Sequence, residues 1–146
     1  MNKVSINDID RFIVAQDSAH CGYKQALQEI ISGRKISHWI WYIFPQFREF
    51  SHSRIAYYYG IKDKEEAYMY ITNPMLRGRL YEITEALLVH KDKPIIEIFG
   101  ELDAGKVRSC MTMFDFISPN DIFAKVLDTF YGGVRGGRTL KVLQKE

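Results

Sequence analysis

Residues 33–47 read GRKISHWIWYIFPQF, and the conformation of this stretch decides the fold class. As a β-strand it would place large apolar side chains on both faces, and both faces would need a cover. No other segment alternates apolar and polar residues in the way that a partner strand requires. We therefore predict a short buried helix over residues 37–43, ended by Pro45 because the residue before a proline disfavours helical geometry.

Helical periodicity in the flanking sequence agrees with this interpretation. Apolar residues recur at spacings of three and four in segments that are separated by Gly, Pro and Asn. The other expected helices span about residues 9–16, 23–32, 74–89 and 102–116, with two more after Asp63 and Pro119 and a short helical turn at 94–99. Their cap signals are Asn7 or Asp8, Asp63 with Glu66, Asn73 before Pro74, and Ser118 before Pro119. The sequence thus predicts an all-α domain with about seven short-to-medium helices.

Length and composition indicate one compact domain over residues 1–146. Apolar residues make up 47% and charged residues 26%, the balance of a globular protein. The formal net charge of +2 argues against a broad surface that tracks the phosphates of duplex nucleic acid. No apolar run approaches the ~18 residues of a membrane span, and Cys21 and Cys110 form no Cys-x-x-Cys motif. We expect a cytoplasmic domain without a membrane contact, a metal or a cofactor.

Polar side chains interrupt the aromatic stretch. Arg34 and Lys35 follow the end of a predicted helix, where cations interact well with the helix dipole. Alternatively, Arg34 makes a bidentate contact with a phosphate or carboxylate, and Trp39 or Trp41 offers a flat face for a base. His38 is either a core histidine or the best general acid or base in the chain.

Further polar side chains lie in the helix predicted over residues 102–116 and in the tail. Lys106 lies between two apolar arcs of that helix, one of which includes Ser109. Its ammonium group therefore either extends to the surface along the methylene stem or meets an anion. In the tail, glycines surround Arg135 and precede Arg138. This segment is either a flexible connector or a set of backbone N–H groups presented to an anion.

Several motifs resemble, in sequence and in order, those of the DUF1810 family of uncharacterised domains. They are RFIVAQ, GRKISHWIWYIFPQ, ITNPMLRGRL, IFGELDAGKVRSCMTMF, and FYGG with RTLKVL, and the resemblance covers about residues 8–143. The resemblance implies a compact all-α domain. The polar motif positions of the family correspond here to Gln16, Arg34, Lys35, His38, Pro45, Gln46, Lys106, Ser109 and Thr112. The sequence departs from the family at residues 48–53, where REFSHS replaces the usual glycine-rich turn.

Two classes of function are open at this point. The first is a site for a nucleotide or another phosphorylated small molecule, with hydrolysis of a glycosidic or phosphoester bond as an extension. Its charge would come from Arg34, Lys35 and Lys106, its stacking from tryptophan, and its proton transfer from His38 or Asp115. RFIVAQ and NPMLRGRL also resemble short motifs of NADAR-type N-glycosidases, which implies glycosidic chemistry. The second class is a non-catalytic module that binds protein or RNA and whose aromatic cluster is core.

The polar residues within apolar segments lead to one geometric prediction. A buried polar group costs free energy unless it meets a partner or a ligand. We therefore expect Arg34, Lys35, His38, Gln46, Lys106 and Ser109 to converge on one concave site. Cations held together there without matching carboxylates would imply an anionic small molecule as the partner.

Overall fold

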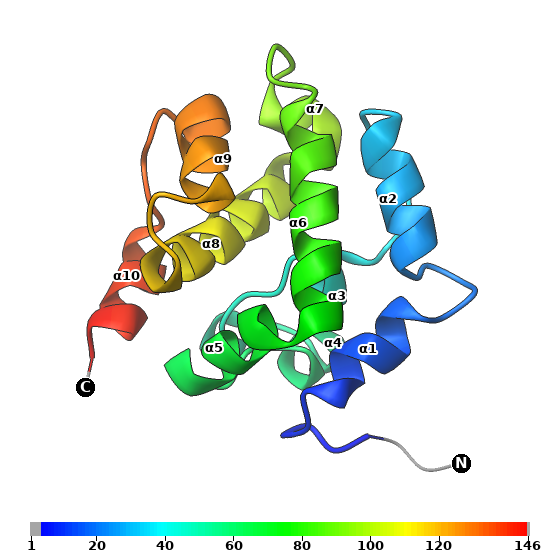
Figure 1. The fold of residues 1–146 in the computed structure, drawn as a ribbon, viewed down its shortest axis with the longest axis vertical. Helices are drawn as coiled ribbons and strands as arrows, with labels where there is room; N and C mark the ends of the chain where they lie inside the picture. Colours follow the sequence, from blue (N-terminus) through cyan, green and yellow to red (C-terminus); the bar gives the residue numbers. More distant parts are fainter. Residues whose placement is uncertain (1–3, 146) are drawn as a thin grey trace.

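The computed structural model describes residues 4–145, and its regular structure is helical (Figure 1). The helices are α1 (Asp10–Gln16), α2 (Tyr23–Ile31), α3 (Ile40–Ile43), α4 (Arg54–Tyr58), α5 (Lys64–Thr72), α6 (Pro74–Leu88), α7 (Ile95–Phe99), α8 (Glu101–Ile117), α9 (Ile122–Tyr131) and α10 (Gly137–Gln144), with a 3-10 turn, η1, at Arg48–Phe50. Within residues 4–145 no β-strand forms, and Phe47 and Ile61 make an isolated parallel bridge. The all-α prediction is confirmed.

Helix α6 lies at the centre of the domain. In Figure 1 it runs along the long axis, with α1 and α2 on one side, α9 and α10 on the other, and α8 crossing behind it. It packs against α2, α5 and α9, while α8 packs against α5, α7, α9 and α10. The buried side chains of α6 are those of the predicted apolar stripe, namely Leu76, Leu80, Ile83 and Leu87, together with Thr84. This stripe joins the two sides of the molecule in one core.

Two of the predicted helix caps are confirmed. The Asp63 carboxylate accepts a hydrogen bond from the backbone N–H of Glu66 at 2.9 Å. The Asn73 side chain accepts from the N–H groups of Met75 at 3.0 Å and Leu76 at 3.1 Å, directly before the proline that opens α6. Both caps satisfy N–H groups that have no partner within their own helix.

The other two helix starts differ from the prediction. Helix α9 begins after Asp121 rather than after Ser118, because the Asp121 carboxylate accepts from the N–H of Ile122 at 2.7 Å. The Ser118 hydroxyl instead donates to that carboxylate at 2.8 Å. At α1 the cap position is Ile9, which makes no side-chain cap bond, and the Asp8 carboxylate accepts from the N–H of the first helical residue at 2.9 Å.

Two segments that were not predicted as helices are helical. The tail forms α10, which buries Thr139 and Leu143, so the interpretation as a flexible connector is wrong. The four glycines of the tail, the last of which is the first residue of α10, obscured a helix whose buried face is only two turns long. Helix α4 follows the REFSHS segment, and the Ser53 hydroxyl caps it by accepting from the N–H of Ala56 at 3.2 Å.

The aromatic stretch forms the single-turn helix α3, shorter than the predicted helix over residues 37–43. Trp39 is 0% exposed, and its indole N–H donates to Glu29 Oε1 at 2.9 Å. The same oxygen accepts from the backbone N–H groups of Ile36 at 2.7 Å and Ser37 at 2.9 Å. Burial alone would raise the pKa of Glu29, but these hydrogen bonds outweigh it and lower the pKa to about 2. One carboxylate of α2 therefore anchors the start of the aromatic stretch.

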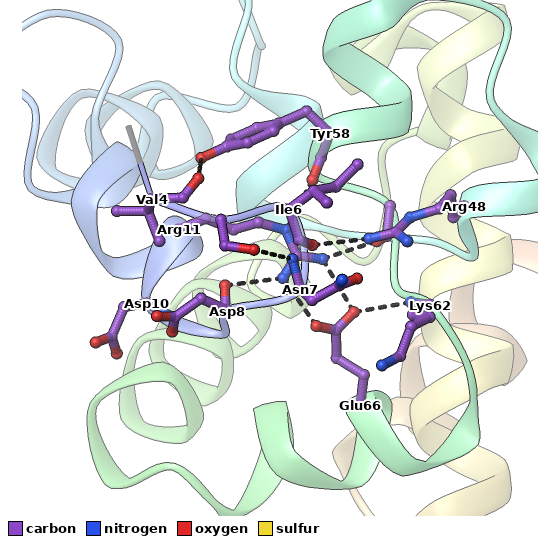
Figure 2. A network of polar contacts seen from close by, with 12 residues as sticks. Val4, Ile6, Asn7, Asp8, Asp10, Arg11, Arg48, Tyr58, Lys62 and Glu66 are labelled. Atoms are coloured by element: carbon purple, nitrogen blue, oxygen red, sulfur yellow. Dashed lines mark hydrogen bonds and ion pairs between the residues drawn. The ribbon is translucent and has the colours of Figure 1, made fainter. Parts of the chain in front are cut away.

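A second buried polar cluster joins the N-terminal region to α4 and α5 (Figure 2). The Arg11 side chain is 0% exposed and forms an ion pair with Glu66 at 2.8 Å. Its guanidinium donates five hydrogen bonds of 2.7–2.9 Å, two of them to the Glu66 carboxylate and the others to the carbonyl groups of Asp8, Tyr58 and Gly60. Because guanidinium has five N–H groups, every donor of Arg11 has an acceptor.

Candidate functional site

A cleft between α8 and the start of α10 is lined by three cationic side chains and by no carboxylate among the described residues. This α8/α10 cleft has a volume of 320 Å³. Its polar side chains are Gln46, His52, Lys106, Arg108, Ser109, Arg138 and Thr139, and no Asp or Glu among the described residues lines it. An excess of positive charge in a concave site favours an anionic ligand.

The cations of the cleft are held by different contacts. The Arg138 guanidinium carbon lies 4.6 Å from the ring centroid of the buried Phe50, which orients the side chain by a cation–π contact. Lys106 Nζ lies 3.5 Å from Asp103 Oδ1. The other oxygen of Asp103 is 2.8 Å from Lys35 Nζ, so this one carboxylate is shared by two lysines. The partial pairing leaves Lys106 available to an anion.

The start of α10 adds backbone donors to the cleft. The N–H of Gly136 donates to Thr112 Oγ1 at 2.9 Å, and Thr112 Oγ1 donates to the Arg108 carbonyl at 2.7 Å, which ties the loop to α8. The first bond of α10 runs from the N–H of Leu140 to the Gly136 carbonyl at 3.0 Å. The N–H groups of residues 137–139 precede it, where a helix leaves donors without intrahelical acceptors and carries partial positive charge.

Thr139 provides an independent sign of a ligand site. The residue lines the cleft and is 1% exposed, and its hydroxyl oxygen makes no hydrogen bond with any other residue in the range 4–145. Leaving a buried polar group without a partner costs about 1–3 kcal/mol. Buried polar groups are nearly always satisfied, so this hydroxyl is open to a partner outside the chain, either a bound water or a ligand.

Five of the six residues expected to share one site are divided between two cavities, and His38 lines neither. Gln46, Lys106 and Ser109 line the α8/α10 cleft, whereas Arg34 and Lys35 line a separate cavity of 470 Å³. Convergence is therefore wrong for the two cations of the aromatic stretch. Lys35 pairs with Asp103, the carboxylate that it shares with Lys106 of the cleft, and its ammonium nitrogen lies 5.2 Å from the Trp39 ring centroid.

The two candidate proton-transfer residues lie outside the cleft. His38 is exposed and lines neither of these two cavities. The Asp115 carboxylate is held by Arg135, whose Nε and Nη2 atoms both lie 3.2 Å from Asp115 Oδ2. Arg135 therefore anchors the loop before α10 to α8 rather than lining the cleft.

Gln16 has a structural position. Its side-chain amide donates to the Tyr42 carbonyl at 2.7 Å and to the Tyr70 hydroxyl at 3.1 Å, and its oxygen accepts from Arg79 at 3.2 Å. Burial raises the pKa of the Tyr70 hydroxyl. Gln16, the polar last residue of α1, is thus satisfied within the core.

The two tryptophans have different surroundings. Trp39 is enclosed in the core, so it cannot stack on a ligand. Trp41 is half-buried and lines a small cavity of 10 Å³ next to the α8/α10 cleft, together with Gln46 and Lys106. The burial of Trp39 agrees with the prediction that the aromatic stretch is buried.

Several important residues carried weak signals in the sequence. Arg138 and Thr139 stand after a glycine pair, and Arg108 and His52 lie among polar neighbours, so only the fold shows that they meet. Glu29 carried a stronger signal. A carboxylate in the last turn of a helix is electrostatically unfavourable unless other groups compensate it, and the donors from residues 36–39 do so.

Within residues 4–145 two further features are absent. No helix there is both long enough and apolar enough to cross a bilayer. No group of three or more His, Cys, Asp or Glu side chains in the same range is placed to hold a metal ion.

The fold and the cleft define a class: an all-α domain with a cationic cleft at the start of its last helix. The family model described as "Protein of unknown function (DUF1810)" matches residues 6–143, and the chain belongs to this family. Among solved structures it is similar to the crystal structure of the conserved hypothetical protein Rv1873 from Mycobacterium tuberculosis. The two are 36% identical with a TM-score of 0.90, over 95% of this chain and 98% of that one. Among curated proteins, none matches the chain.

Proposed function

We propose that the protein binds a phosphorylated small molecule whose phosphate group lies in the α8/α10 cleft. The observation that carries this proposal is the buried Thr139 hydroxyl without a partner, in a cleft lined by three cationic side chains and no carboxylate. Phosphate oxygens would accept from the Arg138 guanidinium and from the N–H groups that open α10, and from the Thr139 hydroxyl after its side chain rotates toward the cleft.

Charge and size support the same ligand class. Lys106, Arg108 and Arg138 line one cavity, and like charges held together are unfavourable until an anion lies between them. The volume of 320 Å³ lies at the lower end of the range for small-molecule sites, roughly 300–1,000 Å³. A phosphate with an attached sugar fits this size better than a macromolecule does.

The proposal is one of binding rather than hydrolysis. His38 and Asp115, which sequence reasoning assigned to proton transfer, both lie outside the cleft. The alternative, a protein- or RNA-binding module whose aromatic cluster is core, is compatible with the burial of Trp39. What favours a small molecule is the concave cationic cleft with its volume of 320 Å³.

Isothermal titration calorimetry with ribose 5-phosphate, at fixed ionic strength, tests the proposal. The wild-type protein should bind, and Arg138→Ala and Lys106→Ala should each weaken binding by about ten-fold or more, because each removes a charge-assisted hydrogen bond worth ~1.5–3 kcal/mol. Lys141→Ala is the matched control, since Lys141 is an exposed cation of α10 that does not line the cleft. Equal affinities for all four proteins, or no binding by the wild type, would refute the proposal.

A further inference from the structure

A larger cavity, the α1/α4 groove, lies next to the α8/α10 cleft. The groove has a volume of 970 Å³ and is lined by side chains of α1, α4 and the segments that precede them. His52 lines both the groove and the cleft. In addition, the 10 Å³ cavity shares Gln46 and Lys106 with the cleft and shares Ser51 and Tyr59 with the groove. The cleft and the groove are therefore neighbouring cavities that meet at His52.

The groove is apolar and aromatic where the cleft is cationic. Tyr57 is 50% exposed, Ile55 41% and Val14 59%, and all three line the groove. The Arg48 guanidinium carbon lies 5.1 Å from the ring centroid of Tyr57 and orients this ring. An exposed cluster of this kind beside a polar site is typical of a cavity that takes the apolar part of a ligand.

The wall of the groove is held from behind by the Arg11 cluster. Arg11 Nε donates to the Tyr58 carbonyl at 2.7 Å, and the Tyr58 hydroxyl donates to the Val4 carbonyl, as Figure 2 shows. Both contacts fix α4 against α1 and against the segment that precedes α1. A groove fixed in this way loses little conformational freedom when a flat ring enters it.

We infer that the phosphorylated molecule is a nucleotide, with its phosphate in the α8/α10 cleft and its base in the α1/α4 groove against Tyr57. This inference rests on the proposed function and adds the class of the ligand. A sugar phosphate has no group to fill an aromatic groove, whereas every base has a flat face that stacks on a tyrosine ring. The polar edge of the groove, formed by His52, Ser53 and Arg54, suits the hydrogen-bonding edge of a base better than an acyl chain.

Titration calorimetry that compares ribose 5-phosphate with AMP, GMP, CMP and UMP tests the inference. At least one nucleotide should bind about ten-fold more tightly than ribose 5-phosphate, because it adds a stacked base. Tyr57→Ala should remove this advantage and leave the affinity for ribose 5-phosphate unchanged, and Tyr57→Phe should retain the advantage. Tyr68→Ala is the control, since Tyr68 is 59% exposed on α5 and lines neither cavity.

The outcomes separate the two proposals. If ribose 5-phosphate binds and no nucleotide binds more tightly, the nucleotide inference fails and phosphate binding stands. Hexyl phosphate binding more tightly than every nucleotide would likewise overturn the inference, because the groove would then take an alkyl chain. If neither ribose 5-phosphate nor any nucleotide binds, both proposals fail.

Circular dichroism melts of the Tyr57 variants should match the wild type. Should Tyr57→Ala fail to fold, Ile55→Ser tests the same groove.

Discussion

Two polar clusters in this protein are built in opposite ways. Around Arg11 every guanidinium N–H has an acceptor, and the Glu66 carboxylate balances the charge. In the α8/α10 cleft, three cationic side chains have no carboxylate in the lining and the Thr139 hydroxyl has no partner within residues 4–145. The Arg11 guanidinium and the Glu66 carboxylate therefore satisfy each other within the fold, whereas the Thr139 hydroxyl, like Arg48 Nε next to the Arg11 cluster, has no partner among the described residues. The contrast separates polar groups that hold the fold from those that, in the function proposed here, bind a ligand.

The largest expected effect is on stability, at Arg11. Arg11→Met should lower the free energy of unfolding by about 3–5 kcal/mol, because it leaves the Glu66 carboxylate buried without its partner. Urea denaturation measures this loss. The matched control is Asp17→Asn, which breaks the exposed ion pair with Arg79 and should cost no more than about 1 kcal/mol. Equal losses for the two variants would show that the buried cluster is not an anchor of the fold.

Glu29 should give a smaller, pH-dependent effect. Its pKa in the folded protein is about 2, below the ordinary value of 4.5, so the ionised carboxylate stabilises the folded state. That stabilisation is present above pH 4.5 and is lost as the pH falls toward 2, by roughly 3 kcal/mol in all. Unfolding measured across this range should show a shallower acid limb for Glu29→Gln. An identical acid limb would mean that Glu29 does not anchor the aromatic stretch.

Local signals explain which parts of the fold could be predicted. The caps at Asp63 and Asn73 and the stripe of α6 depend on residues a few positions apart, and sequence reasoning found them. The tail was misread because the glycines that open α10 are also typical of a connector. Its helix is fixed by burial of Thr139 and Leu143 against α8, which is a long-range contact.

The candidate site was only partly predictable for the same reason. Gln46, Lys106 and Ser109 stand out as polar residues within apolar segments, and the fold does bring them together. Lys35 stands out equally, but its direction is set by Asp103, a residue distant in sequence that no local pattern connects to it. Which polar side chains are satisfied within the fold and which line the cleft therefore depends on tertiary contacts rather than on residue type.

Arg34 and Arg108 line different cavities, and this difference gives a more modest prediction about binding. Arg34→Ala should leave the affinity for ribose 5-phosphate unchanged, because Arg34 lines the 470 Å³ cavity at the end of α2. Arg108→Ala, which removes the same charge from the cleft, should weaken binding by several-fold. Calorimetric titrations of the two variants check this. Weaker binding by Arg34→Ala alone would transfer the site to the other cavity.

The smallest expected change is in the stability of the unliganded protein when Thr139 is replaced by valine. Thr139→Val keeps the shape of the side chain and removes a buried hydroxyl that has no partner. The free energy of unfolding should therefore stay the same or rise by up to about 1 kcal/mol, whereas removal of a satisfied hydroxyl would lower it. Urea denaturation at constant ionic strength gives this value.

The same Thr139→Val comparison, repeated with and without saturating ribose 5-phosphate, tests the central claim most directly. A ligand that binds only the folded state raises the free energy of unfolding, and at 100 times its dissociation constant the gain is ~2.7 kcal/mol. We predict that the wild type shows such a gain and that Thr139→Val, although no less stable alone, shows a clearly smaller one. A variant that is destabilised by more than about 1 kcal/mol without ligand, and stabilised as much as the wild type with it, would contradict the account. The Thr139 hydroxyl would then serve the fold, as the donors of Arg11 do.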